Sequence, residues 1–101
     1  MTNEELKELL REIALDGADD MIILEGDEFA DGAVGISYGN HVVYDYQKLI
    51  ESLSKHNNWT EEEAMEWLDY NTLRALPYMK ADGKEPIIMI DRFSDYLGEG
   101  N

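Results

Sequence analysis

The spacing of apolar residues predicts a helix at the start of the chain. Four apolar residues recur there at intervals of three or four, which is the period of an amphipathic helix. They are Leu6, Leu9, Leu10 and Ile13. Thr2 and Glu5 have the spacing of a capping box, so the helix is expected to begin beside them. Gly17 is expected to end it, because glycine readily adopts the left-handed conformation that closes many helices.

Shorter apolar stretches predict strands. Residues 21–24 form an apolar run between acidic turns, and residues 86–90 form a second run near the end of the chain. Between them, apolar and small residues alternate over 33–38, and 41–44 is again mostly apolar. Gly39-Asn40 separates these two stretches and suits a primed turn, so a hairpin is predicted.

Two further helices are predicted between the hairpin and the last strand. Asp45 can cap the first of them, and the pair of asparagines at 57–58 interrupts its pattern. Thr60 begins the second, and Glu63 three residues later completes a capping box. Pro77 is expected to end this helix, because proline removes a backbone donor and obstructs the preceding turn.

The order of elements is therefore α-β-β-β-α-α-β. Because the strands cluster and do not alternate with helices, an α+β fold is favoured. We expect a small, mostly antiparallel sheet of about four strands, with helices packed on one face. Residues 1–101 are long enough for a single domain, and the segment from about 92 reads as a frayed acidic tail.

The amino-acid composition excludes several classes of function. Lys plus Arg number 8 and Asp plus Glu number 23, giving a formal net charge of −15. That balance argues against direct nucleic-acid binding and against an anionic membrane surface, since both need excess cations. Cysteine is absent, which excludes disulfides and thiolate sites. The N-terminus lacks the pattern of a signal peptide, and no apolar run approaches membrane-spanning length, so a cytoplasmic location is expected.

Three stretches carry a resemblance to a known family. They are VVYDYQKLI at 42–50, WTEEEAMEWLDYN at 59–71 and PII at 86–88. Together they resemble a family of short phage and prophage proteins, over roughly residues 33–90. The family has no known catalytic residues, so the resemblance implies no reaction. It implies a phage-type accessory protein, which would act in the cytoplasm of the host cell.

The acidic residues gather in two segments without local cations. Residues 16–31 contain seven acids and no basic residue. On the helix from Thr60, one side carries three further acids, and no Lys, Arg or His lies within 58–72. The candidate partner-binding residues are Asp16, Asp19, Asp20, Glu25, Asp27, Glu28, Asp31, Glu62, Glu66 and Asp69. Like charges three or four residues apart destabilise a helix by about 0.2–0.5 kcal/mol per pair, so stability alone does not favour this arrangement.

Two interpretations of this acidity remain open. In one, the carboxylates imitate the charge of a nucleic-acid backbone and bind the basic groove of a nucleic-acid-binding protein. A phage protein of that kind would inhibit a host nuclease or CRISPR effector, as an anti-CRISPR or anti-restriction protein. In the other, the chain is a non-enzymatic accessory or assembly protein, which can form a homodimer and whose acidity serves solubility.

Catalysis and metal binding find little support in the sequence. The acids at 25–31 do not match a calcium loop, because Phe29 stands where an oxygen ligand is required. His41 and His56 have no catalytic signature around them, and a histidine at a helix end has a structural use. We therefore expect no cofactor, no dedicated metal and no enzymatic activity.

Overall fold

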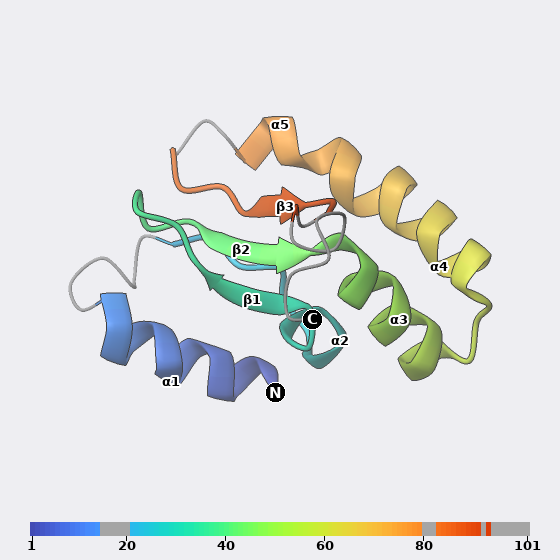
Figure 1. The fold of residues 1–101 in the computed structure, drawn as a ribbon, viewed down its shortest axis with the longest axis horizontal. Coiled ribbons are helices and arrows are strands. Elements are labelled where there is room, and N and C mark those ends of the chain that lie inside the picture. The colour runs from blue at the N-terminus through green and yellow to red at the C-terminus, as the bar shows by residue number, and fades with distance from the viewer. Residues whose placement is uncertain (15–20, 80–82, 92, 94–101) are drawn as a thin grey trace.

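A computed structural model describes residues 1–14, 21–79, 83–91 and 93, which form a sheet with helices packed against it (Figure 1). The helices and strands are α1 (Asn3–Ala14), α2 (Asp27–Ala30), β1 (Ala33–Ile36), β2 (Val42–Asp45), α3 (Tyr46–Asn57), α4 (Glu61–Trp67), α5 (Leu76–Met79) and β3 (Ile87–Met89). A π-helical turn (Leu68–Thr72) and a 3₁₀ turn (Leu73–Ala75) join α4 to α5. The predicted α+β class is confirmed.

The sheet has three strands in the order β1-β2-β3. β1 and β2 are antiparallel, with Ala33 opposite Tyr44, whereas β2 and β3 are parallel, with Tyr44 opposite Ile88. The helical run from α3 to α5 carries the chain back to the end where β2 began, which makes the second pair parallel. The sheet is therefore mixed and has one strand fewer than the sequence predicted.

The strand predicted at 21–24 does not form. Its backbone makes one hydrogen bond to the segment before β3 and one to a side chain of β2. The Ile22 N–H donates to the Lys84 carbonyl at 3.2 Å, and the Leu24 N–H donates to the Tyr44 hydroxyl at 2.9 Å. Met21 and Leu24 are buried. The run is apolar because it packs into the core, and an apolar run of this length does not reveal by itself whether it joins a ladder.

The local signals at chain reversals are mostly confirmed. The two bonds of the predicted capping box at Thr2 and Glu5 are both present, and α1 begins there. Asn40 adopts φ 63°, but the hairpin loop has three residues and not two, since Ser37 N donates to the His41 carbonyl at 2.8 Å. The expected helix end at Gly17 lies outside the described residues, as does the predicted tail apart from Phe93.

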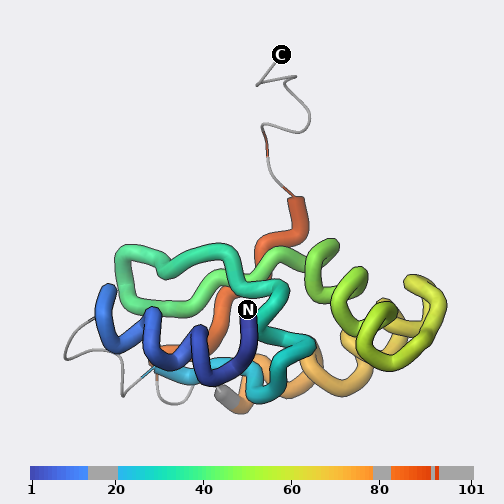
Figure 2. The backbone as a smooth tube through the Cα atoms, turned by 90° about the horizontal axis from the view of Figure 1, so that it is seen from below, coloured from blue at the N-terminus to red at the C-terminus, as the bar shows by residue number. Residues whose placement is uncertain are grey.

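The core lies on one side of the sheet. Figure 2 shows α1 and the run from α4 to α5 on the same side of the β1–β2 hairpin. The largest side chains that are almost fully enclosed come from β2, α3 and the π-helical turn. They are Val42, Tyr44, Leu49, Ile50, Leu53 and Leu68. The prediction of helices on one face is confirmed, and the opposite side of α4 is left facing solvent.

The helical run after Thr60 continues past the predicted end. Pro77 lies in the first turn of α5, where its missing N–H is not needed, so it does not end the run. Before it, the π-helical turn holds one more residue than an α-turn, shown by the Leu73 N–H donating to the Leu68 carbonyl. This extra residue turns Thr72 into the core and leaves Asn71 exposed.

Candidate functional site

Of the four described acids of the first segment, Glu25, Asp27 and Asp31 have side-chain partners inside the molecule. Three of the seven lie outside the described residues: Asp16, Asp19 and Asp20. Glu25 accepts a hydrogen bond from the Asn3 side-chain amide at 2.7 Å and lies 3.5 Å from the Lys7 ammonium. Asp27 accepts from the Asn3 backbone N–H at 2.7 Å. These carboxylates therefore join the chain before α2 to the beginning of α1.

Asp31 is held in the same way. One of its oxygens lies 2.7 Å from the Met1 ammonium, and the other lies 3.2 Å from Nε2 of His56. The hydrogen bond from the ammonium, helped by His56, lowers the pKa of Asp31 despite partial burial. Glu28 contributes through its backbone carbonyl, which accepts a hydrogen bond from the Ser52 hydroxyl at 2.6 Å. The described part of this segment is thus tied to α1 and α3.

The acids of α4 are arranged differently. Glu62 and Glu66 are exposed and meet no cation or hydrogen-bond donor among the described residues. Asp69 accepts a hydrogen bond from the Tyr46 hydroxyl at 2.7 Å, which fixes the carboxylate without neutralising it. Burial of the Tyr46 hydroxyl, together with this bond to Asp69, raises the pKa of Tyr46 to about 12. The hydroxyl therefore stays protonated at neutral pH and continues to donate.

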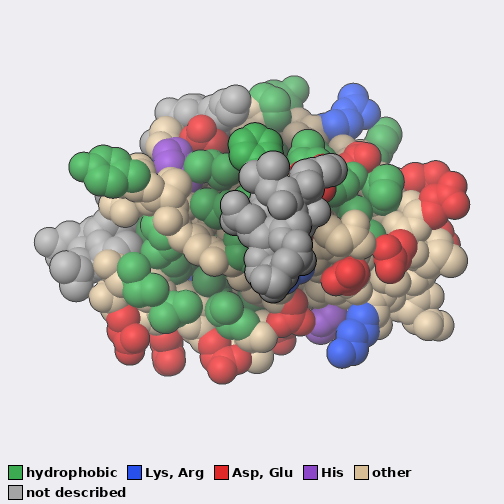
Figure 3. All heavy atoms as spheres, viewed as in Figure 1, with side chains coloured by type: hydrophobic (Ala, Val, Ile, Leu, Met, Phe, Trp, Pro, Cys, Tyr) green, Lys and Arg blue, Asp and Glu red, His purple; other side chains and the backbone are tan. Residues whose placement is uncertain are grey.

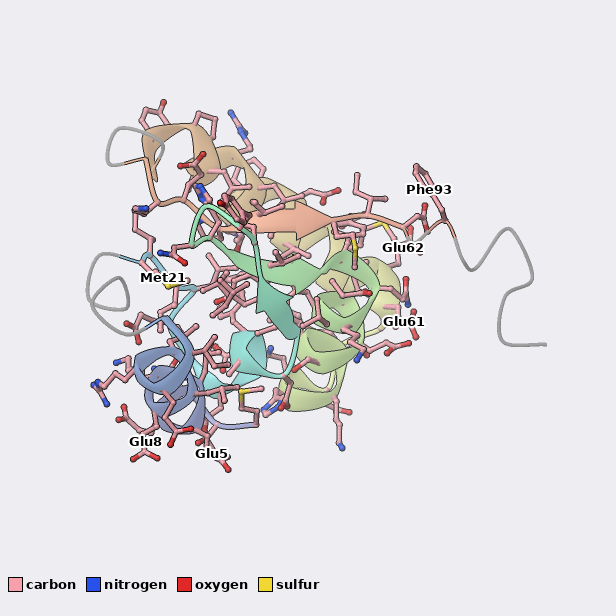
Figure 4. The ribbon with its side chains drawn as sticks, turned by 60° about the vertical axis from the view of Figure 1, so that its left-hand side comes forward. Glu5, Glu8, Met21, Glu61, Glu62 and Phe93 are labelled. Atoms are coloured by element: carbon pink, nitrogen blue, oxygen red, sulfur yellow. The ribbon has the colours of Figure 1, made fainter. Side chains whose placement is uncertain are left out.

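The ion pairs of the described residues involve α1, the N-terminus and α3, but not α4. Over the described ranges, the cation of each ion pair is Met1, Lys7 or His56, and none of their partners belongs to α4. In Figure 4, Glu5 and Glu8 project from α1 at one end of the view, whereas Glu61 and Glu62 project at the other. In Figure 3, acidic side chains lie along the lower edge and the right-hand edge of the molecule. The carboxylates of α1 and α4 therefore form two surfaces, not one.

A hollow of about 440 Å³ lies along α4 beside its free carboxylates. It is lined by Trp59, Glu63, Glu66, Trp67 and Tyr70. The two indole rings lie 6.0 Å apart between centroids with an angle of 43° between their planes. Trp67 is supported from beneath by Phe29, at 6.1 Å, and remains 37% exposed, while Tyr70 is 68% exposed. Large aromatic rings left open to solvent are candidates for an interface.

Local structure places these side chains together. Residues 63, 66, 67 and 70 recur at helical spacing, so they share one stripe of α4 and the turn after it, and Trp59 lies just before the Thr60 cap. The side chain of Thr60 accepts from the Glu63 N–H at 3.1 Å, and Oε1 of Glu63 accepts from the Thr60 N–H at 2.9 Å. This capping box lowers the pKa of Glu63 and fixes its carboxylate at the rim. In the turn after α4, the Asn71 side-chain amide donates a hydrogen bond to the Trp67 carbonyl at 3.0 Å.

Sequence reasoning selected Glu62, Glu66 and Asp69 but missed the hollow. Apolar rings at helical spacing usually indicate core residues, and Trp59 does pack against the core, but Trp67 is 37% exposed. The available signal was the interleaving of aromatic residues with Glu63 and Glu66 on the same stripe. What the spacing could not give was the exposure of the rings, which depends on how deeply α4 sinks against α2 and α3.

The histidines have structural contacts. Nδ1 of His41 lies 2.7 Å from the Glu85 carbonyl, and His56 faces Asp31. Within the described ranges, no three histidine or acidic side chains converge in a way that could hold a metal ion. None of the helices described here is both long enough and apolar enough to cross a membrane.

Comparison with known proteins adds no relative. No protein-family model, curated protein or solved structure matches this chain. The surface of α4 and its surroundings are therefore the basis for a proposed function.

Proposed function

We propose that this protein binds the basic groove of a nucleic-acid-binding protein and excludes nucleic acid from it. The surface that binds is the exposed side of α4 with the turn that follows. Its carboxylates pair with the Lys and Arg that otherwise hold phosphates. The target class is a nuclease or CRISPR effector, and the protein acts by stoichiometric binding in the host cytoplasm as a phage-type inhibitor.

One observation carries this proposal. The carboxylates of Glu62 and Glu66 meet no cation within the described part of the chain, whereas Glu25 and Asp31 each face an ammonium or a histidine. Neighbouring carboxylates on a helix are separated by about 5–6 Å at Cβ, so α4 presents a dense row of negative charge. Such a row attracts a cationic groove, speeds association and fixes orientation.

Contacts inside the fold favour a smaller set of acids for the proposed binding surface. Glu25, Asp27 and Asp31 already have partners in α1, at the N-terminus or in α3, so their charge is less available. We therefore place Glu62, Glu66 and Asp69 at the centre of the proposed surface and assign the described acids of 25–31 a supporting role.

The test is competition between this protein and labelled nucleic acid for a basic partner captured from host lysate at low salt. Glu62→Gln, Glu66→Gln and Asp69→Asn together remove three charges while preserving side-chain size and the acceptor for Tyr46. This variant should compete about tenfold more weakly, since three exposed ion pairs together account for that order of affinity. Raising the salt concentration should weaken competition by the unmodified protein.

A matched control removes the same charge from the other surface. Glu4→Gln, Glu8→Gln and Glu12→Gln change α1 by three charges and should leave competition within about twofold. Equal weakening by both variants would mean that net charge alone is responsible and would refute a specific α4 surface. Full competition by the α4 variant would refute it as well.

A second function, that of an accessory or assembly protein, is favoured by an apolar groove of about 320 Å³ between α1 and β1. Leu9, Ile13 and Val34 line it and are 41%, 58% and 39% exposed. If this protein works by apolar association there, neither charge variant changes its binding. The competition experiment therefore separates the two functions.

A further inference from the structure

We propose that the hollow bounded by Trp59, Trp67, Tyr70, Glu63 and Glu66 is a binding site for a single arginine side chain of the partner. This inference rests on the proposed function, because the hollow lies within the same α4 surface. It goes further by naming the group that enters and the residues that select it. The chemistry is recognition of a planar cation by aromatic faces and carboxylates.

The walls of the hollow suit a flat, cationic group. The two indole rings pack against each other, with their centroids 6.0 Å apart and their planes inclined by 43°, so a cation would contact the exposed part of Trp67 beside this pair. Aromatic faces attract cations within about 6 Å of the ring centroid, and tryptophan does so most strongly. Tyr70, 68% exposed, supplies a third ring, so the site combines apolar faces with negative electrostatic potential.

The carboxylates complete the site from one side. Glu63 is fixed by its capping-box bond to the Thr60 N–H at 2.9 Å, so it needs little ordering when a ligand arrives. Glu66 has no partner among the described residues and is free to accept from a guanidinium. A carboxylate and an aromatic face together recognise arginine better than lysine, because the guanidinium is planar and has several donors in fixed directions.

The molecule already contains one contact of this kind. The Arg74 guanidinium lies 5.0 Å from the centroid of the Tyr70 ring. Arg74 is not among the residues that line the hollow, so this cation contacts Tyr70 from outside it. Arginine is also the residue that proteins use most for bidentate contacts with phosphate. The basic groove of a nucleic-acid-binding protein therefore presents arginine side chains.

The experiment follows the two indole N–H signals by NMR, since Trp59 and Trp67 are the only tryptophans in the chain. The probes are three end-blocked pentapeptides that carry arginine, lysine or citrulline between glycines, titrated at low salt. Citrulline has nearly the shape of arginine without its charge. Saturable shifts of both indole signals with the arginine peptide, weaker shifts with lysine and none with citrulline are expected.

Matched variants locate the contact. Glu66→Gln and Tyr70→Ser should each weaken arginine binding by about two- to fivefold. Glu62→Gln removes the same charge from α4 outside the hollow and should change it less than either. All three altered residues are exposed, and thermal unfolding of each variant verifies the fold. Equal shifts with arginine and citrulline, or equal loss in Glu66→Gln and Glu62→Gln, would overturn the arginine site.

The two proposals fail separately. If the α4 charge variant loses competition with nucleic acid but the indole signals do not distinguish the peptides, the acidic surface stands and the arginine site is wrong. If the arginine peptide binds the hollow but the protein never competes with nucleic acid, the site stands and the proposed function is wrong.

Discussion

Replacing Tyr44 with phenylalanine tests how residues 21–24 are held in the fold. The Tyr44 side chain is 0% exposed, and its hydroxyl accepts a hydrogen bond from the Leu24 N–H at 2.9 Å. Tyr44→Phe keeps the ring and removes this acceptor, so a buried backbone N–H loses its partner. An unsatisfied buried donor costs about 1–3 kcal/mol in the free energy of unfolding. In a domain of this size, each kcal/mol lowers the unfolding midpoint by about 4–8 °C.

Thermal unfolding monitored by circular dichroism measures this loss, and hydrogen exchange of the Leu24 amide locates it. The matched control is Tyr78→Phe, because Tyr78 is 84% exposed and its hydroxyl should matter little. A Tyr44→Phe protein that unfolds with the control, and in which the Leu24 amide exchanges no faster, would show that packing alone holds this segment.

Alkaline pH gives a second measurement of the same site. Burial raises the pKa of Tyr44 to about 12, above the ordinary value of 10.0. A raised pKa in the folded state favours the protonated form, so its contribution is complete below pH 10 and is lost as pH rises towards 12. The unmodified protein should therefore lose more stability than Tyr44→Phe over that range, and parallel curves would contradict the assignment.

Two further predictions concern a close backbone approach and a helix cap. A Cβ at Gly32 would collide with the fully buried side chain of Leu49, so Gly32→Ala should destabilise the fold by about 1–3 kcal/mol. Gly35→Ala meets no atom within 4 Å and is the matched control in denaturant unfolding, where equal midpoints would refute the clash. The bonds to Thr60 lower the pKa of Glu63 below 4.5, so its stabilising effect is present above pH 4.5 and is lost on further acidification. Thermal melts between pH 6 and pH 3 should therefore show a smaller loss in Glu63→Gln than in the unmodified protein, and an identical loss would exclude the charged cap.

Much of the local structure could be predicted from the sequence because its signals involve residues close together in the chain. The two capping boxes, the Asp45 cap and the left-handed Asn58 at the end of α3 are such features. Each depends on a side chain reaching a backbone group a few positions away, so spacing is sufficient. The charge pattern of α4 was available for the same reason, since Glu62, Glu66 and Asp69 share a helix face in any fold.

The remaining features depend on contacts between distant parts of the chain, which only the tertiary structure decided. Residues 21–24 are apolar enough for a strand, yet β3 pairs with β2 and residues 21–24 pack into the core without joining the sheet. The sequence around the acids of 25–31 contains no cation, so they were interpreted as unpaired. In the fold, Asn3, Lys7 and His56 lie beside them. The aromatic hollow likewise exists because α2 supports Trp67 from beneath while its outer side stays open. Sequence spacing determines which side chains share a face, but burial and pairing depend on what packs against that face.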